Sequence, residues 1–233
     1  MGAKKIKPVR KPQKKPAPPP DTAFERAKKW ADKNYALLMG IGGAALFAII
    51  LAWGFISHDR SKQAQACTDY GLLAQRLPAE DKVSAADWEK IVPDLARFVS
   101  EYRDTALALD AGIELAKAYF ETKRYEDAVK TGEEALRLAP SGHNLRPLIM
   151  YQLGYAYEAD GKADEAARTW KDLKEMGVVE FEREADWNLA RIYESKKEFD
   201  KAAEMYRSAS QSPGDFPPAG LIDLQIARVK AEK

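Results

Sequence analysis

Residues 115–140 read LAKAYFETKRYEDAVKTGEEALRLAP, and their pattern of small and aromatic side chains occurs twice more downstream. In this first copy the pattern consists of Ala116, Tyr119, Ala128, Gly132 and Ala135. The same spacings of 3, 9, 4 and 3 residues recur in Gly154, Tyr157, Ala166, Trp170 and Leu173, and again in Ala190, Tyr193, Ala202, Tyr206 and Ala209. The copies begin 38 and then 36 residues apart. Such a period is typical of a helical solenoid, in which each unit packs on its neighbours.

Each copy resembles the tetratricopeptide repeat (TPR), a helix–turn–helix unit of about 34 residues. As in that family, a leucine precedes the first small residue, at Leu115, Leu153 and Leu189. The aromatic residue that opens the second helix is present as Tyr125 and Phe199, whereas the middle copy has Ala163. The terminating proline is Pro140 in the first copy, Val178 stands there in the second, and Pro213 comes one place early in the third. The resemblance implies an all-α protein whose residues 105–216 form three TPR-like repeats.

Solenoids need atypical end units, and the flanking sequence supplies candidates for both ends. Residues 57–104 read as a divergent helical pair, with helices over 57–77 and 84–102. Ser84 with Asp87 predicts the start of the second helix, and Pro93 is expected to break or kink it. Residues 217–233 are expected to form a capping helix, for which the spacing of Leu221, Leu224, Ala227 and Arg228 is suitable.

Residues 35–56, YALLMGIGGAALFAIILAWGFI, form a run of 22 residues without a charged side chain. A helix of that length spans about 33 Å, enough for a hydrocarbon core of about 30 Å. We therefore expect one transmembrane helix before the solenoid. A buried core helix and a cleaved signal sequence remain alternatives. Ala64-Gln65-Ala66 before Cys67 resembles a cleavage site, but a charged stretch separates it from the apolar run.

The net charge of +1 averages two different segments. Residues 1–34 hold 11 basic and 3 acidic residues, whereas residues 57–233 hold 26 basic and 33 acidic ones. Basic residues that flank a membrane helix tend to remain on the cytoplasmic side. We therefore expect a cytoplasmic N-terminus and a C-terminal part on the other side of the membrane. Residues 1–34 are predicted to form a largely disordered, Pro/Lys-rich tail with a short amphipathic helix over 23–34. The acidic C-terminal part argues against a nucleic-acid partner.

Small residues recur every four positions along the apolar run, at Ala36, Gly40, Ala44, Ala48 and Ala52. This spacing places them on one helix stripe, where a second membrane helix can approach closely. The stripe is a candidate packing surface for a copy of this chain or for another membrane protein.

In TPR domains the first helix of each repeat lines a concave groove, and the resemblance carries that role onto nine positions here. They are Ile113, Lys117 and Phe120 in the first repeat, Tyr151, Tyr155 and Glu158 in the second, and Trp187, Arg191 and Glu194 in the third. Five of the nine are large and apolar or aromatic, which suits a polypeptide ligand better than a sugar or an ion. The alternative is that a neighbouring repeat or the C-terminal helix covers them. The basic, Asn-rich clamp that some TPR domains use for peptide termini is not present in this pattern.

No residue pattern predicts catalysis, a cofactor or a metal. His58 and His143 have no nucleophile or acid arranged around them, and one cysteine with two histidines makes a metal centre improbable. Acidic pairs such as Glu182 with Glu184 are expected on solvated helix faces. Cys67 is interpreted as a packed or idle thiol. We therefore expect a binding protein and not an enzyme.

A basic tail, one membrane helix and an exported TPR domain together resemble the YfgM-like family of ancillary subunits of the Sec translocon. The segment FVSEYRDTALALDAGIELAKAYFETKRYEDAV, at 98–129, carries most of the likeness, and LIDLQIARVK at 221–230 adds to it. The resemblance implies a single-pass inner-membrane protein with a periplasmic domain, which contacts the translocon and acts as a chaperone or adaptor for exported polypeptides. A structural scaffold of an envelope complex, in division, secretion, motility or respiration, is the alternative.

Overall fold

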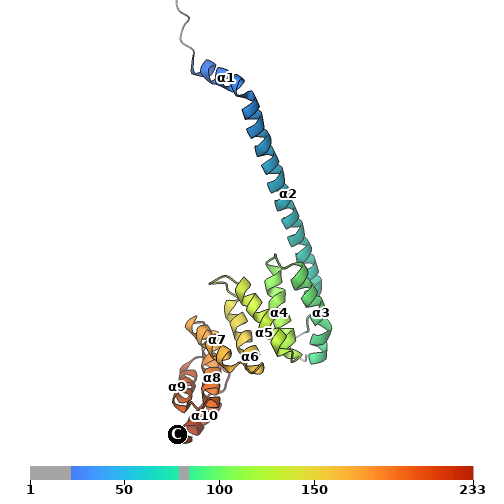
Figure 1. The fold of residues 1–233 in the computed structure, drawn as a ribbon. Helices are drawn as coiled ribbons and strands as arrows, with labels where there is room; N and C mark the ends of the chain where they lie inside the picture. The colour runs from blue at the N-terminus through green and yellow to red at the C-terminus, as the bar shows by residue number, and fades with distance from the viewer. Residues whose placement is uncertain (1–21, 79–83, 233) are drawn as a thin grey trace, which may run out of the picture. The chain divides into compact units, whose positions relative to one another are not determined.

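The computed structural model describes residues 22–78 and 84–232, and this part of the chain is all helical, with no strand (Figure 1). The chain divides into two compact units, one within residues 1–58 and the other within residues 59–233. Most of the predicted basic tail, residues 1–21, lies outside the described residues.

In the first unit, α1 covers Ala23–Lys33, close to the helix predicted over 23–34. A capping box starts it: the Thr22 N–H donates to the Glu25 carboxylate at 2.8 Å, and the Glu25 N–H donates to the Thr22 hydroxyl at 3.2 Å. Helix α2 then begins at Tyr35 and contains a window of 18 residues with a mean hydropathy of 2.2 and no buried residue. It is therefore long and apolar enough to cross a membrane.

Helix α2 runs over Tyr35–Ala74, so the predicted membrane span and the first helix of the divergent pair are one continuous helix. The charged stretch after Ile56 contains neither glycine nor proline, and nothing in it interrupts helical hydrogen bonding. The last turns of α2 belong to the second unit. There Ala66 and Leu73 are buried in a core cluster with residues of the next two helices.

Helix α3 covers Ala85–Glu101, and the predicted break at Pro93 is wrong. Pro93 is exposed. Water can therefore donate to the backbone carbonyl that the missing proline N–H would have bonded. On the buried face, Val92 and Leu95 hold the helix to the core. Its start is as predicted, because the Asp87 carboxylate accepts hydrogen bonds from the Ser84 hydroxyl at 2.7 Å and from the Ser84 N–H at 3.3 Å.

Three helix pairs follow, one for each predicted repeat. They are α4 (Leu107–Glu121) with α5 (Tyr125–Leu138), α6 (Arg146–Ala159) with α7 (Ala163–Glu175), and α8 (Val179–Ser195) with α9 (Phe199–Gln211). Each helix packs on the next in the chain, and α4 also contacts α6 while α6 contacts α8 (Figure 1). The first helices of successive repeats therefore lie side by side and form one face of the solenoid.

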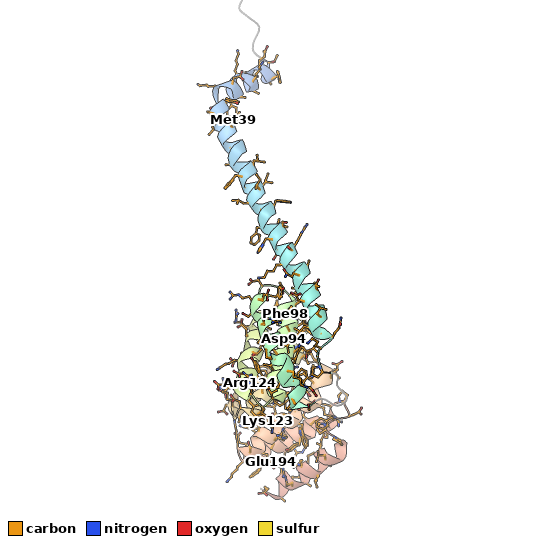
Figure 2. The ribbon with its side chains drawn as sticks, turned by 90° about the vertical axis from the view of Figure 1, so that its right-hand side faces the viewer. Met39, Asp94, Phe98, Lys123, Arg124 and Glu194 are labelled. Carbon is orange, nitrogen blue, oxygen red and sulfur yellow. The ribbon has the colours of Figure 1, made fainter. Side chains whose placement is uncertain are left out.

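The turn inside each repeat has the same backbone geometry. Lys123, Gly161 and Lys197 occupy equivalent positions and have φ angles of 61°, 75° and 61°. Figure 2 labels Lys123 and Arg124 in the first of these turns. In the first turn the Arg124 N–H donates to the Tyr119 carbonyl at 2.8 Å and the Lys123 N–H donates to the Phe120 carbonyl at 2.9 Å. The other two turns repeat this pair of bonds. All three are Schellman motifs, which turn the chain sharply into the second helix.

The small residues of the pattern lie where helices approach each other. A Cβ atom on Gly154 would come within 2.6 Å of the Trp170 ring, and one on Gly132 within 3.0 Å of Leu153. Trp170 is fully buried and lies in a cluster with Leu153, Leu173 and Leu189. The repeat pattern thus pairs a small residue with the large side chain that fills the space above it.

Helix α10 (Ala219–Ala231) packs on α9 as a C-terminal helix, as predicted, but not through the residues whose spacing predicted it. Ile222 and Val229 are fully buried in a cluster with Ala202 and Tyr206. Leu221, Leu224, Ala227 and Arg228 are all exposed. This short helix has apolar side chains on two faces, and the face with the β-branched residues Ile222 and Val229 packs against α9.

Candidate protein-binding groove

A hollow of about 500 Å³ lies on the face formed by the first helices of repeats one and two, with α5 as its floor. We call it the α4–α6 hollow. Its lining consists of Ala116, Lys117, Phe120, Glu121, Ala128, Gly132, Leu148, Tyr151, Gln152, Leu153, Tyr155 and Ala156. It brings together four of the predicted contact residues, namely Lys117, Phe120, Tyr151 and Tyr155. Its volume is in the range of pockets that hold small ligands or a few side chains of a peptide.

Aromatic packing fixes the walls of this hollow. Phe120 contacts the Tyr125 ring, with centroids 5.6 Å apart. Tyr151 and Tyr155 meet edge to face at 5.2 Å, and each also contacts the Trp170 ring, at 5.9 and 5.0 Å. The Lys117 ammonium lies 5.4 Å from the centre of the Trp88 ring in α3, which holds its charge at the rim.

Glu184 of α8 binds both tyrosines of the wall. Its carboxylate accepts hydrogen bonds from the Tyr151 hydroxyl at 2.9 Å and from the Tyr155 hydroxyl. Burial, together with this carboxylate, raises the pKa of Tyr151 to about 12 and also raises the pKa of Tyr155. Both phenols act as donors that tie α6 to α8.

The polar network continues from Tyr155 along α8. The Asn188 amide donates to the Tyr155 hydroxyl at 3.1 Å, and the Arg191 guanidinium donates to the Asn188 carbonyl oxygen at 2.9 Å. Arg191 also pairs with Glu158 at 3.3 Å. Burial raises the pKa of Glu158, against the opposing effects of the Trp170 N–H bond at 2.8 Å and of Arg191.

The remaining predicted contacts are placed differently. Trp187 and Arg191 line a second, shallower hollow of about 330 Å³ with Glu194, which accepts a hydrogen bond from Tyr206 at 2.9 Å. Trp187 is only 9% exposed and packs on the Tyr206 ring. Ile113 lies in neither hollow, because its side chain is 6% exposed and packs against Ala135, Ala139 and Ile149.

Sequence reasoning missed the role of Glu184, because it was expected on a solvated face with Glu182. Glu184, Asn188 and Arg191 follow one another at helical spacing, which is the available signal, but only the tertiary structure places the tyrosines of α6 opposite them. The stripe Ala36, Gly40, Ala44, Ala48 and Ala52 lies along α2 and is exposed throughout. Its role in packing stays a prediction.

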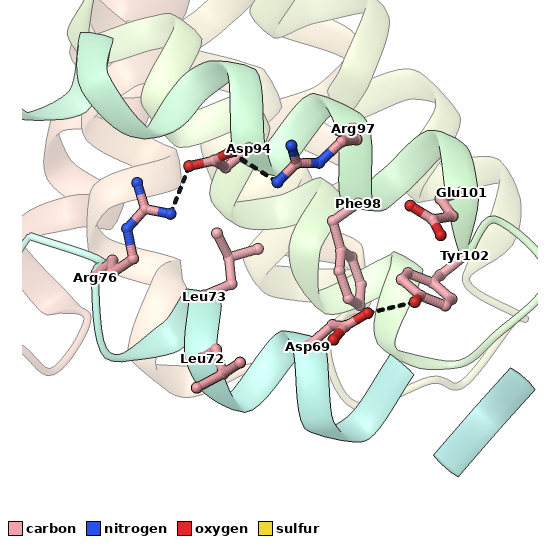
Figure 3. A pocket seen from close by; sticks show the side chains of 9 residues that line it. All are labelled: Asp69, Leu72, Leu73, Arg76, Asp94, Arg97, Phe98, Glu101 and Tyr102. Atoms are coloured by element: carbon pink, nitrogen blue, oxygen red, sulfur yellow. Dashed lines mark hydrogen bonds and ion pairs between the residues drawn. The ribbon is translucent and has the colours of Figure 1, made fainter. Parts of the chain in front are cut away.

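A third hollow, of about 240 Å³, lies between the end of α2 and α3 (Figure 3). Asp94 binds Arg76 at 2.6 Å and Arg97 at 2.9 Å on one side of it, and Tyr102 donates to Asp69 at 2.5 Å on the other. That hydrogen bond raises the pKa of Tyr102 to about 12. The Arg76–Asp94 pair and the Tyr102–Asp69 hydrogen bond join the end of α2 and the turn after it to α3, and we assign this hollow a structural role.

Features of other site types are sparse in the described part of the chain. Residues 22–78 and 84–232 contain no group of three or more His, Cys, Asp or Glu side chains placed to hold a metal ion. His143 accepts a hydrogen bond from the Leu145 N–H at 3.2 Å within its own loop, and Cys67 is exposed on α2.

Comparison with known proteins agrees with the repeat pattern. Two crystal structures of nearly identical TPR-like repeats from a Podosopora anserina protein described as a kinesin light chain share 19% identity with this chain. They cover 74% of this chain and 85% of their own, with a TM-score of 0.53. PcrH, solved in complex with the chaperone binding region of PopB, shares 16% identity over 55% of this chain and 97% of its own, with a TM-score of 0.43. No curated protein matches the sequence.

Two family models also match the chain. Residues 151–216 match the tetratricopeptide repeat. Residues 28–178, which make up more than half of the chain, match the tetratricopeptide repeat-like domain. The chain therefore belongs to the family of tetratricopeptide repeat-like proteins, whose domains are protein-interaction modules.

Proposed function

We propose that this chain is a membrane-anchored adaptor that binds segments of other polypeptides in the α4–α6 hollow. The observation that carries the proposal is the lining of this hollow by Phe120, Tyr151 and Tyr155, with Lys117 and Gln152 among the polar groups around them. An apolar centre with a polar rim is typical of surfaces that take up side chains of a partner protein and bind its main chain at the edge.

The membrane anchor in this proposal is the first part of α2. Large apolar side chains there are exposed, for example Trp53 at 71% and Phe55 at 76%. Water is a poor environment for such a surface, whereas lipid is a suitable one. Basic residues are concentrated before the helix, so we place the N-terminus in the cytoplasm and the repeats in the periplasm of a cell with an inner membrane.

The resemblance to the YfgM-like family supports one partner class in particular. A domain held beside the translocon meets exported chains before they fold, when their apolar side chains are accessible. We therefore propose a translocon-associated chaperone or adaptor that holds such segments. Neither a cofactor nor an enzymatic step is part of this function.

The hydrogen-bond network behind the hollow favours a second candidate. Glu184 holds Tyr151 and Tyr155 in fixed positions, so this wall is preorganised. A fixed wall suits one folded partner better than many unfolded ones. A scaffold subunit of an envelope complex is therefore the alternative function.

Photocrosslinking in intact membranes tests the proposal. A photoreactive residue replaces Gln152 in the hollow, and a matched one replaces the exposed Arg168 on α7 as a control. We expect the residue at 152 to capture a range of exported polypeptides, and the residue at 168 to capture far fewer.

The captured proteins distinguish the two functions. One recurrent set of folded envelope proteins at position 152 would replace the chaperone by the scaffold. Equal capture at both positions would contradict a binding role for the α4–α6 hollow.

A further inference from the structure

The last helix, α10, has an apolar face that nothing covers within the described residues. Its inner face is closed by Ile222 and Val229, which are fully buried against α9. On the outer face Leu224 is 63% exposed and Leu221 is 38% exposed, and Phe216 just before the helix is 60% exposed. Two leucines and an aromatic residue in this helix and just before it form a surface that another protein can cover.

The outer face has the spacing of a helix-pairing seam. Gly220, Leu224, Ala227 and Ala231 are all exposed and follow one another at intervals of 4, 3 and 4 residues. This alternation places them on one stripe along the helix, as in the core positions of coiled coils. Three of the four are small, so a partner helix can approach closely.

We propose that this stripe pairs with the same stripe of a second copy of the chain, with the two α10 helices antiparallel. A two-fold axis between residues 225 and 226 places Leu224 opposite Ala227 of the partner subunit and Gly220 opposite Ala231 of the partner subunit. A large side chain then meets a small one at the centre, and small residues meet at both ends. Such self-complementarity is what an isologous interface requires.

The charges beside the stripe support the same register. Asp223 and Lys230 lie on one flank of it, and neither has an ion-pair partner among residues 22–78 and 84–232. In the antiparallel pair, Asp223 lies on the same side as Lys230 of the partner subunit, and symmetry makes the contact twice. On the other flank Arg228 already binds Glu194 of its own chain, and Leu221 is beside it.

Charge exchange tests the proposal on the full chain in detergent micelles, with dimerisation measured by sedimentation and by fluorescence transfer between labelled copies. Asp223→Lys places two lysines together, and Lys230→Asp places two carboxylates together. We expect each single variant to weaken dimerisation about tenfold or more. The double variant D223K/K230D restores it, and so does mixing the two single variants, because the opposite charges then face each other again.

An apolar substitution pair provides the second measurement. Leu224→Glu is expected to abolish the dimer, whereas Leu138→Glu, at a leucine 40% exposed on α5, leaves it unchanged. Both positions are exposed, so both variants should keep the helical content of the parent chain. A chain that is monomeric throughout, or a dimer that survives both D223K and L224E, would overturn the proposal; in the second case the contact lies elsewhere, for example in the small-residue stripe of α2.

Discussion

Close contact at single residues explains the repeat pattern, and Gly154 shows it most directly. A methyl group there would lie 2.6 Å from carbon atoms of the Trp170 ring, which is fully buried and cannot move away. We expect Gly154→Ala to lower the free energy of unfolding by about 1–3 kcal/mol. Gly112→Ala is the control, because no atom beyond its chain neighbours and the backbone of its own helix lies within 4 Å of its Cβ position, and helix propensity favours alanine there. Urea titrations of the two variants that gave equal losses would contradict this account.

The turns inside the repeats favour glycine for a different reason, which is their positive backbone φ angle. Lys123 is exposed and has a φ of 61°, a conformation that costs an L-residue about 1 kcal/mol or more and costs glycine little. Lys123→Gly should therefore raise the melting temperature, whereas Gly161→Ala at the equivalent turn should lower it. Thermal unfolding followed by circular dichroism checks both signs. A fall in melting temperature for both variants would show that the turn geometry is not conserved between repeats.

The start of α3 makes stability depend on pH. Hydrogen bonds from Ser84 and Lys90 lower the pKa of Asp87 from 3.8 to about 2. The ionised carboxylate therefore stabilises the folded state at pH values above 3.8, and this contribution is lost as the pH falls through about 2. In Ser84→Ala we expect the pKa of Asp87, measured by NMR titration, to return toward 3.8. An unchanged pKa would mean that Ser84 is not its main partner.

At the scale of helices, periodicity predicted the elements well because apolar positions recur at helical spacing in each repeat. Which face of a helix is buried was harder to predict. In α10 the spacing of Leu221 and Leu224 predicted the closing helix, but Ile222 and Val229 are the side chains buried against α9. For α3, the predicted break at Pro93 ignored that an exposed proline can be tolerated when the opposite face is well packed.

The same limit applies to the candidate groove. Four predicted contacts share the α4–α6 hollow because the family pattern places them on the first helices of two adjacent repeats. Ile113 is on such a helix too, but α5 and α6 cover it. Glu184 could not be assigned from the sequence, since its tyrosine partners are 29 and 33 residues away.

One buried ion pair joins three helices and has a measurable role. The Lys174 ammonium of α7 binds Asp186 of α8 at 2.6 Å, and the Ser208 hydroxyl of α9 donates to the same carboxylate at 2.5 Å. Asp186 is 1% exposed. Lys174→Met leaves that charge uncompensated, and we expect it to lower the free energy of unfolding by about 3–5 kcal/mol.

The matched control is the pair of Lys171 and Glu175, which is exposed and separated by 3.8 Å. Lys171→Met should change the free energy of unfolding by less than about 0.5 kcal/mol, because exposed pairs contribute little. Similar losses in both variants, measured by urea titration, would show that Asp186 is solvated and not buried.

At the scale of the whole molecule, the single cysteine provides a test of the proposed topology. Cys67 is exposed and follows the apolar run on α2. A maleimide that cannot cross membranes should label it from the outer side of intact spheroplasts. The control is Ala27→Cys in a C67A chain, which should react only after permeabilisation. Labelling of position 27 without permeabilisation would reverse the orientation.

The α4–α6 hollow is proposed to receive a polypeptide, and blocking the hollow tests this proposal most directly. Gln152→Trp fills the hollow from its lining, whereas Gln152→Ala leaves it open. The full chain in lipid nanodiscs is titrated with a reduced and carboxymethylated polypeptide as the unfolded probe. We predict affinity about tenfold weaker for Q152W than for Q152A, with equal melting temperatures. The same affinity in both variants and in the parent chain would contradict the claim.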